Sequence, residues 1–200
     1  VYASKGNHII TCLTEHKAVL DTCHDLEKKG MTVTYLPVNS KGFIETDLLK
    51  EAITSSTILF AFMFANNETG VIQPIEEIGQ IAKQNNILFF CDATQAVGKI
   101  PVDVNQMQVD LLAFSAHKMY GPKGCGALYV RRKNPRVVLK PQITGGGHER
   151  GFRSGTLNVP GIAGFGKAAE ICSREMQQEA LLLGKWRNEL EHSFLSTGIA

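Results

Sequence analysis

Residues 57–64 read TILFAFMF, an apolar run without a charged side chain. A strand with one face in water alternates apolar and polar residues, so an unbroken run predicts a strand that is covered on both faces. Such strands are typical of parallel sheets with helices packed on either side. Further apolar runs predict strands at residues 8–12 (HIITC), 32–38 (TVTYLPV), 87–91 (ILFFC), 110–115 (DLLAFS) and 127–131 (ALYVR).

Helical patterns alternate with these strands. The predicted helices span residues 16–29, 46–53, 74–84 and the stretch from Pro160 onward. Val19 and Cys23 fall on the apolar face of the first helix, and Thr46 is expected to be the N-cap of the second. Alternating strands and helices predict an α/β fold with three α/β/α layers around a mostly parallel sheet.

Charge and composition argue against several classes of protein. The 200 residues carry 21 Lys and Arg against 19 Asp and Glu, a net charge of +2, whereas nucleic-acid-binding domains usually show a clustered basic excess. The longest apolar run, residues 58–65, falls far short of the ~20 residues that a membrane-spanning helix needs. Residues 1–10 show no secretory leader, and no GxxxxGK[ST] phosphate loop is present.

The five cysteines form no CxxC pair, which argues against a zinc site. Their number is odd, and Cys12, Cys91 and Cys125 lie in or beside apolar strand-like runs, where a free cysteine acts as a small hydrophobic residue. This favours a reducing compartment, so we expect a cytoplasmic protein. Cys172 lies in the helical tail and is expected to be a core residue.

Polar side chains directly follow four of the predicted strands. They are His16; Asn67; Asp92 and Gln95; and Ser115, His117 and Lys118. Asn67 and Asp92 are 25 residues apart, and Asp92 and Lys118 are 26 apart, so each interval can hold one helix and one strand. Because parallel strands end at one edge of a sheet, where ligands bind, we expect these side chains to lie together.

Taken singly, these residues have ordinary structural interpretations. Asp92 can cap a helix that starts near Thr94, Asn67 can belong to a turn, and Lys118 can be a solvated loop lysine. Independent accidents of this kind would not all be expected at strand ends, so a shared function is the better interpretation.

An amine, a carboxylate and an imidazole at one edge suit pyridoxal phosphate. A lysine amine condenses with its aldehyde, and a carboxylate keeps its pyridine nitrogen protonated. His16 can stack on the ring, and Gln95 or Asn67 can donate to the phenolic oxygen. Ser115 and His117 can donate to the phosphate.

Five motifs run in order through nearly the whole chain. They are TEHKAVLD (14–21), NNETGVIQPI (66–75), CDATQAVGKIPVDV (91–104), FSAHKMYGPKGCGALYVRR (114–132) and GGGHERGFRSGT (145–156). Together they resemble the cysteine desulfurases, which are pyridoxal-phosphate enzymes of the aminotransferase class-V group. The resemblance implies the large domain of a fold-type-I pyridoxal-phosphate transferase. It also implies conversion of L-cysteine to L-alanine, with sulfur passed as a persulfide to an acceptor or iron–sulfur scaffold protein.

The resemblance implies a role for each residue of the site. Lys118 would bind the cofactor covalently, Asp92 would pair with the pyridinium nitrogen, and Gln95 would bond the phenolic oxygen. His16 would stack on the ring and take part in acid–base steps. The remaining implied contacts are Asn67 near the phenolic oxygen and the substrate carboxylate, Ser115 and His117 on the phosphate, and Thr156 on the phosphate of the partner subunit in a homodimer.

The resemblance also implies that residues 1–200 form an incomplete cofactor-binding large domain. The helical tail from about residue 160 would lead toward a C-terminal small domain. The family's N-terminal phosphate loop and its loop with the persulfide cysteine have no counterpart in these 200 residues. We therefore expect the isolated chain to bind the cofactor weakly and to be inactive.

Several alternatives remain open at this point. The chain could belong to another class-V enzyme, a selenocysteine lyase or an aminotransferase, or to a non-catalytic scaffold on the same fold. Lys123 in GPKG is the second candidate for the cofactor lysine, although it is not at a strand end. The basic residues between Arg131 and Arg136 are expected to be a solvated strand end, with docking of an acidic partner as the other interpretation.

Overall fold

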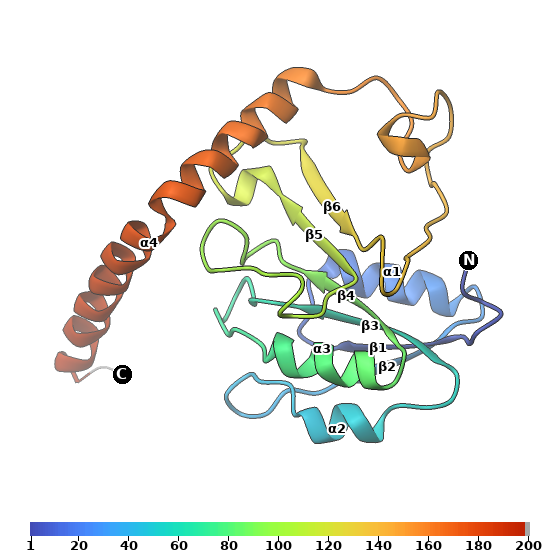
Figure 1. Cartoon of the computed structure of the whole chain (residues 1–200). Helices are drawn as coiled ribbons and strands as arrows, with labels where there is room; N and C mark the ends of the chain where they lie inside the picture. Colours follow the sequence, from blue (N-terminus) through green and yellow to red (C-terminus); the bar gives the residue numbers. More distant parts are fainter. Residues whose placement is uncertain (199–200) are drawn as a thin grey trace.

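A six-stranded sheet forms the centre of the protein (Figure 1). The computed structural model describes residues 1–198. The strands are β1 (His8–Cys12), β2 (Thr32–Leu36), β3 (Thr57–Met63), β4 (Leu88–Asp92), β5 (Leu111–Ser115) and β6 (Gly126–Val130). The helices are α1 (Lys17–Glu27), α2 (Thr46–Glu51), α3 (Ile75–Gln84) and α4 (Val159–Ser196), with short 3-10 turns η1 (Ala116–Lys118) and η2 (Glu149–Gly151).

The strand order is β2-β1-β3-β4-β5-β6. All neighbouring pairs are parallel except β5 and β6, which run antiparallel. The prediction of a mostly parallel α/β sheet is therefore confirmed. Every predicted strand is present, and no strand end is shifted by more than two residues.

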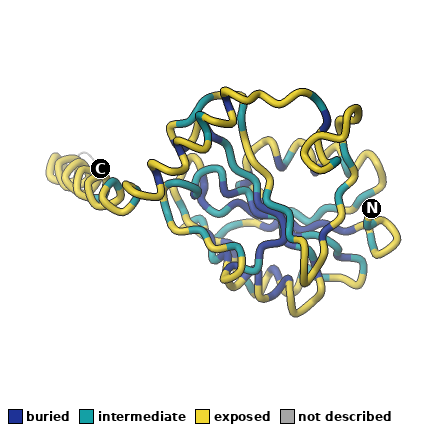
Figure 2. Tube along the Cα trace, turned by 45° about the horizontal axis from the view of Figure 1, so that its top comes forward, coloured by how far each residue is buried: buried dark blue, intermediate teal, exposed yellow. Residues whose placement is uncertain are grey.

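Helices cover both faces of this sheet, as predicted. On one face α2 and α3 pack on the main core, which contains Leu49, Phe60 and Ile78. On the other face α1 contributes Val19 and Cys23 to a smaller cluster around Ala61. Figure 2 shows the buried residues gathered along the central strands, between the two helical layers. Because β3 is covered on both faces, its sequence has no polar alternation.

The prediction that Thr46 is the N-cap of α2 is wrong. Glu45 occupies the N-cap position and makes no capping side-chain hydrogen bond, and Thr46 is the first helical residue. The Thr46 hydroxyl instead donates to Glu77 Oε1 of α3 at 2.6 Å. A contact between two helices thus replaces the local cap that the sequence suggested.

The buried residues of the long helix α4 all lie in its first half. Asn158 caps it, with Oδ1 accepting from the Gly161 backbone N–H at 3.2 Å. Gly161, Ala168 and Cys172 are its buried residues, so the prediction that Cys172 is a core residue is confirmed. Among the described residues of α4, none after Cys172 is buried, and this part projects from the body of the protein (Figure 2).

No helix within residues 1–198 is both long and apolar enough to cross a membrane.

Candidate functional site

The carboxyl ends of β4 and β5 bring the predicted carboxylate and amine to one edge of the sheet. Asp92 is the last residue of β4 and is in register with Ala113 of β5. The Ala93 backbone N–H donates to Ala113 O at 2.9 Å and holds the two strand ends together. After Ser115 the chain enters η1, which carries Lys118. The spacing of 26 residues between Asp92 and Lys118 therefore does correspond to adjacent strand ends.

Asp92 is partly exposed and orders the turn that follows it. Its Oδ1 accepts from the Thr94 backbone N–H at 2.9 Å. Its side chain makes no other hydrogen bond within residues 1–198, which leaves Oδ2 available to a ligand. A helix starting near Thr94 does not form, because residues 94–99 are successive turns. Gln95 lies in these turns, and its Oε1 accepts from Lys99 Nζ at 2.9 Å.

The segment from Ser115 to Lys118 is a tight polar turn. Ser115 Oγ and His117 Nδ1 lie 2.7 Å apart in a hydrogen bond. The Ala116 backbone N–H donates to Cys125 O at 3.0 Å. His117 and Lys118 are exposed, and the Lys118 amine has no ion pair or hydrogen bond to any described residue. The turn thus presents a hydroxyl, an imidazole and an unpaired amine side by side.

His16 is the N-cap of α1, one residue outside the helix in which it was predicted to lie. Its Nδ1 accepts from the Ala18 backbone N–H at 3.1 Å. A neutral imidazole in this position must carry its proton on Nε2. The cap therefore fixes the ring orientation and leaves the Nε2–H group as the free hydrogen-bonding group.

Asn67 lies exposed in the turn after β3, and the buried residue of that turn is its neighbour Asn66. Asn66 Nδ2 donates to Thr14 O at 2.9 Å, which ties the loop after β3 to the loop after β1. Asn66 Oδ1 also accepts from the Glu68 and Thr69 backbone N–H groups. The sequence patterns indicated no role for Asn66, although its place directly after a buried strand was an available signal.

Glu15 is a second residue for which the sequence patterns indicated no role. It is only 5% exposed, and its Oε1 accepts from the Met63 backbone N–H at 2.7 Å. Met63 is in register with Asp92, so Glu15 lies beneath the same edge of the sheet. Burial, and secondarily the charge of Asp92, raises the pKa of Glu15 to about 8. Its Oε2 is buried without a hydrogen-bond partner among the described residues.

Thr156 is the one predicted residue that does not lie at the end of a strand or directly after one. It is exposed in the loop between η2 and α4. The segment before it closes on itself across η2, with Ser154 Oγ accepting from the Gly147 backbone N–H at 3.2 Å. The expected contact of Thr156 with a partner subunit stays a prediction.

The donors at this edge fit pyridoxal phosphate. An unpaired amine, a carboxylate with a free oxygen, and a hydroxyl paired with an imidazole are the groups that its aldehyde, ring nitrogen and phosphate require. The orphaned Oε2 of Glu15 shows in addition that this edge holds unsatisfied polar capacity. No cluster of three or more His, Cys, Asp or Glu suited to a metal ion occurs within the described part of the chain.

Comparison with known proteins identifies the family of this chain. The sequence profile of the aminotransferase class-V family matches residues 2–192. The chain belongs to the aminotransferase class-V family. Among solved structures of related proteins, one described as a NifS-like protein superimposes with a TM-score of 0.93 and 43% identity. That match covers 98% of this chain and 54% of the other.

Curated class-V relatives are more similar still in sequence. The cysteine desulfurase IscS of Anaeromyxobacter sp. (strain Fw109-5) is 61% identical over 179 residues, which is 90% of this chain and 44% of that protein. The mitochondrial cysteine desulfurase of Candida maltosa is 54% identical over 195 residues, which is 98% of this chain and 40% of that protein. The chain thus spans less than half the length of these curated relatives.

Proposed function

We propose that this chain is the cofactor-binding part of a pyridoxal-phosphate-dependent cysteine desulfurase, which converts L-cysteine to L-alanine and passes the sulfur on as a persulfide. The observation that carries the proposal is the register of β4 and β5, which sets Asp92 and the turn bearing Lys118 at adjacent strand ends. Identity of 61% to a cysteine desulfurase favours this activity over that of other class-V enzymes.

The proposed roles follow from the groups that each side chain offers. Lys118 would bind the aldehyde carbon through its unpaired amine, and Asp92 would hold a proton on the ring nitrogen through its free oxygen. Ser115 and His117, already hydrogen-bonded to each other, would bind the phosphate. When bound, pyridoxal phosphate supplies an electron sink that stabilises negative charge on the substrate.

Three further residues would complete the ring contacts. His16 would lie against the ring, with its Nε2–H group available for proton transfer, because Nδ1 is engaged by the backbone of α1. Gln95 and Asn67 would bond the phenolic oxygen. Gln95 now bonds Lys99, so that contact would have to be exchanged when the cofactor binds.

The proposal extends to the assembled protein. Residues 1–200 would form the large domain, and α4 would lead to a C-terminal small domain. Thr156 would reach the phosphate bound by the second copy of a homodimer, and a sulfur acceptor or iron–sulfur scaffold protein would receive the persulfide. A related structure is described as SspA in complex with cysteine, at 46% identity and a TM-score of 0.79, which supports cysteine as the substrate class. We also propose a cytoplasmic location, because the five cysteines are free thiols.

Reductive trapping tests the central assignment. The chain is mixed with excess pyridoxal phosphate, its visible absorption is recorded, and borohydride then fixes any lysine adduct for intact-mass measurement. We expect partial occupancy in the unmodified chain and loss of the absorption band and adduct in Lys118→Ala.

Lys123→Ala is the matched control, because Lys123 is an exposed lysine five residues further along. We expect this variant to keep the absorption band and the adduct. Equal adduct yields in the two variants would overturn the assignment of Lys118.

A further inference from the structure

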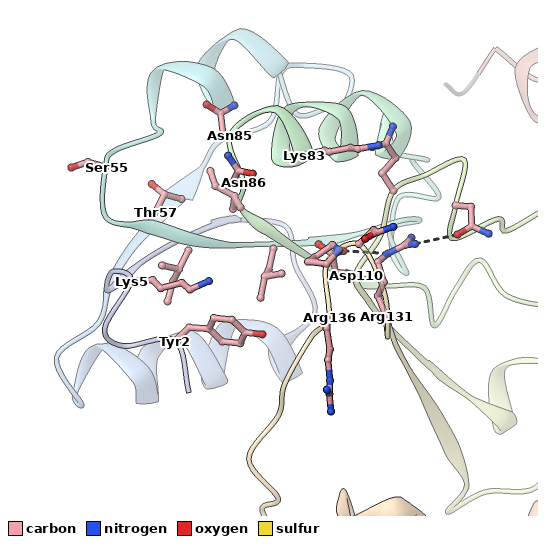
Figure 3. Close-up of a pocket in the computed structure, with 17 residues that line it drawn as sticks. Tyr2, Lys5, Ser55, Thr57, Lys83, Asn85, Asn86, Asp110, Arg131 and Arg136 are labelled. Atoms are coloured by element: carbon pink, nitrogen blue, oxygen red, sulfur yellow. Dashed lines mark hydrogen bonds and ion pairs between the residues drawn. The ribbon is translucent and has the colours of Figure 1, made fainter.

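A cavity opens at the amino-terminal edge of the sheet, opposite the site described above. Its volume is about 650 Å3, within the range of small-molecule sites. It is lined by the residues that precede β1, the start of β3 and the segment that joins α3 to β4. The segment before β5 and the segment after β6 complete the lining. Figure 3 shows Tyr2 and Lys5 on one side of this space and Asn85 and Asn86 on the other.

A buried ion pair forms one wall of the cavity. Arg131 Nε lies 3.2 Å from Asp110 Oδ1, and the two side chains are 14% and 8% exposed. Arg131 Nη2 also donates to the carbonyl oxygens of Val104 and Val109, and Asp110 Oδ2 accepts from the Phe89 backbone N–H. The expectation that Arg131 is a solvated strand-end residue is therefore wrong. Its charge is balanced within the protein, as is that of Asp110.

The other basic side chains of the cavity have no such partner. Lys5, Lys83 and Arg136 line it, and none forms an ion pair with a described residue. Asp110 is the only acidic residue in the lining, and it is already paired with Arg131. These three cations are exposed, and with no free acidic side chain in the lining they make the cavity more favourable for an anion than for a cation.

Neutral hydrogen-bond donors accompany these cations. The Tyr2 hydroxyl accepts from the Val138 backbone N–H at 2.9 Å, which fixes its oxygen and leaves its own proton free to donate. Lys5 Nζ lies 5.6 Å from the centre of the Tyr2 ring, so the ring holds this lysine near the cavity. The carboxyl end of α3 carries the negative end of the helix dipole, which disfavours an anion. There Asn85 Nδ2 donates to the Ile81 carbonyl oxygen at 2.8 Å and satisfies one of the free carbonyl groups.

We propose that this cavity binds a small multivalent anion of the phosphate class, held by Lys5, Lys83 and Arg136. Ammonium and guanidinium groups form charge-assisted hydrogen bonds with phosphate oxygens, and two phosphate groups can engage cations from opposite walls. The proposal is independent of the pyridoxal-phosphate site, which lies at the other edge of the sheet. Either free polyphosphate or the diphosphate of a nucleotide offers this chemistry.

Calorimetric titration with pyrophosphate, and separately with ADP, tests the proposal. We expect one saturable site for pyrophosphate and a loss of about tenfold or more in affinity in Lys83→Ala/Arg136→Ala. Tighter binding of ADP than of pyrophosphate would identify a nucleotide as the source, and equal binding would identify the phosphate groups alone. Absence of saturable pyrophosphate binding in the unmodified chain would overturn the proposal.

Two control variants distinguish this cavity from a general effect of surface charge and from the cofactor site. Arg132→Ala removes an exposed charge of the same segment that does not line the cavity, and it should leave the affinity within about twofold. His117→Ala removes a proposed phosphate contact of the cofactor site, so this variant reports whether any pyrophosphate binds there instead. A loss in Arg132→Ala equal to that in the double variant, or a loss in His117→Ala, would contradict the assignment.

Discussion

Replacing Glu15 with glutamine should make folding stability less dependent on pH. Burial raises the pKa of Glu15 to about 8 from its ordinary value of 4.5, so the folded chain retains a proton that the unfolded chain releases between these pH values. Because the folded state binds more protons there, its stability falls as pH rises. The slope is about 1.4 kcal/mol per pH unit, so Glu15 costs roughly 4 kcal/mol between about pH 5 and pH 8.

The neighbouring thiols do not titrate in the pH range in which Glu15 does. The thiols of Cys23 and Cys91 lie close enough to interact with it, and burial raises the pKa of both above the ordinary value of 9.0. They therefore remain neutral between about pH 5 and pH 8. Glutamine keeps the carbonyl oxygen that accepts from Met63 but cannot ionise. Glu15→Gln should match the unmodified chain near pH 5 and become the more stable protein by a few kcal/mol near pH 8.

Urea denaturation at about pH 5, 6.5 and 8 measures this difference. The signal should be far-ultraviolet circular dichroism, because the single tryptophan, Trp186, is 55% exposed on the projecting part of α4 and does not report on the core. Glu51→Gln, at an exposed position in α2, is the control and should show no such trend. A stability difference between Glu15→Gln and the unmodified chain that is constant over this pH range would refute the reasoning.

Three further substitutions test the core packing, a close helix contact and the buried ion pair. Phe60→Ala removes a fully buried ring and should cost about 3–5 kcal/mol in urea denaturation, and a loss below about 1 kcal/mol would contradict its place in the core. Gly79→Ala would drive a methyl group into the Met107 carbonyl oxygen, so α3 must shift, at about 1–3 kcal/mol by calorimetry; an unchanged melting temperature would argue against that close contact. Arg131→Met leaves the Asp110 carboxylate buried without its partner and should cost about 3–5 kcal/mol in thermal unfolding, whereas a neutral effect would show that the pair is dispensable.

The sheet was predictable because burial on both faces leaves a clear trace in the sequence. The run at residues 57–64 and the polar residues after each strand suffice to place Asp92 and Lys118 at one edge. The reversed direction of β6 was not anticipated, since GALYV has the same pattern in either direction. Its signal was the connection of ten residues, 116–125, which is shorter than a parallel crossover requires.

The details that escaped prediction all depend on tertiary partners. Threonine is a residue type typical of N-caps, but the Thr46 hydroxyl donates its hydrogen bond to Glu77 of another helix. Arg131 lies in a basic stretch typical of a solvated strand end, but Asp110 and backbone carbonyls bind it within the protein. Glu15 is a charged residue in a short loop before a helix, a position that is usually exposed, but it is buried and bonded to the Met63 backbone. Sequence patterns report which residues can make such contacts, and the fold decides which contacts form.

The helix α4 forms one continuous element of secondary structure, yet its two parts have very different support. The Tyr120 hydroxyl donates to Glu179 Oε1 at 2.5 Å, and beyond this tether the side-chain hydrogen bonds of the described residues all stay within the helix. Helices without tertiary packing are marginal in water. Amide protons of α4 should therefore exchange with deuterium slowly up to Cys172 and rapidly past Glu179. The C-terminal part of this helix would then unfold locally long before the sheet and its other helices do.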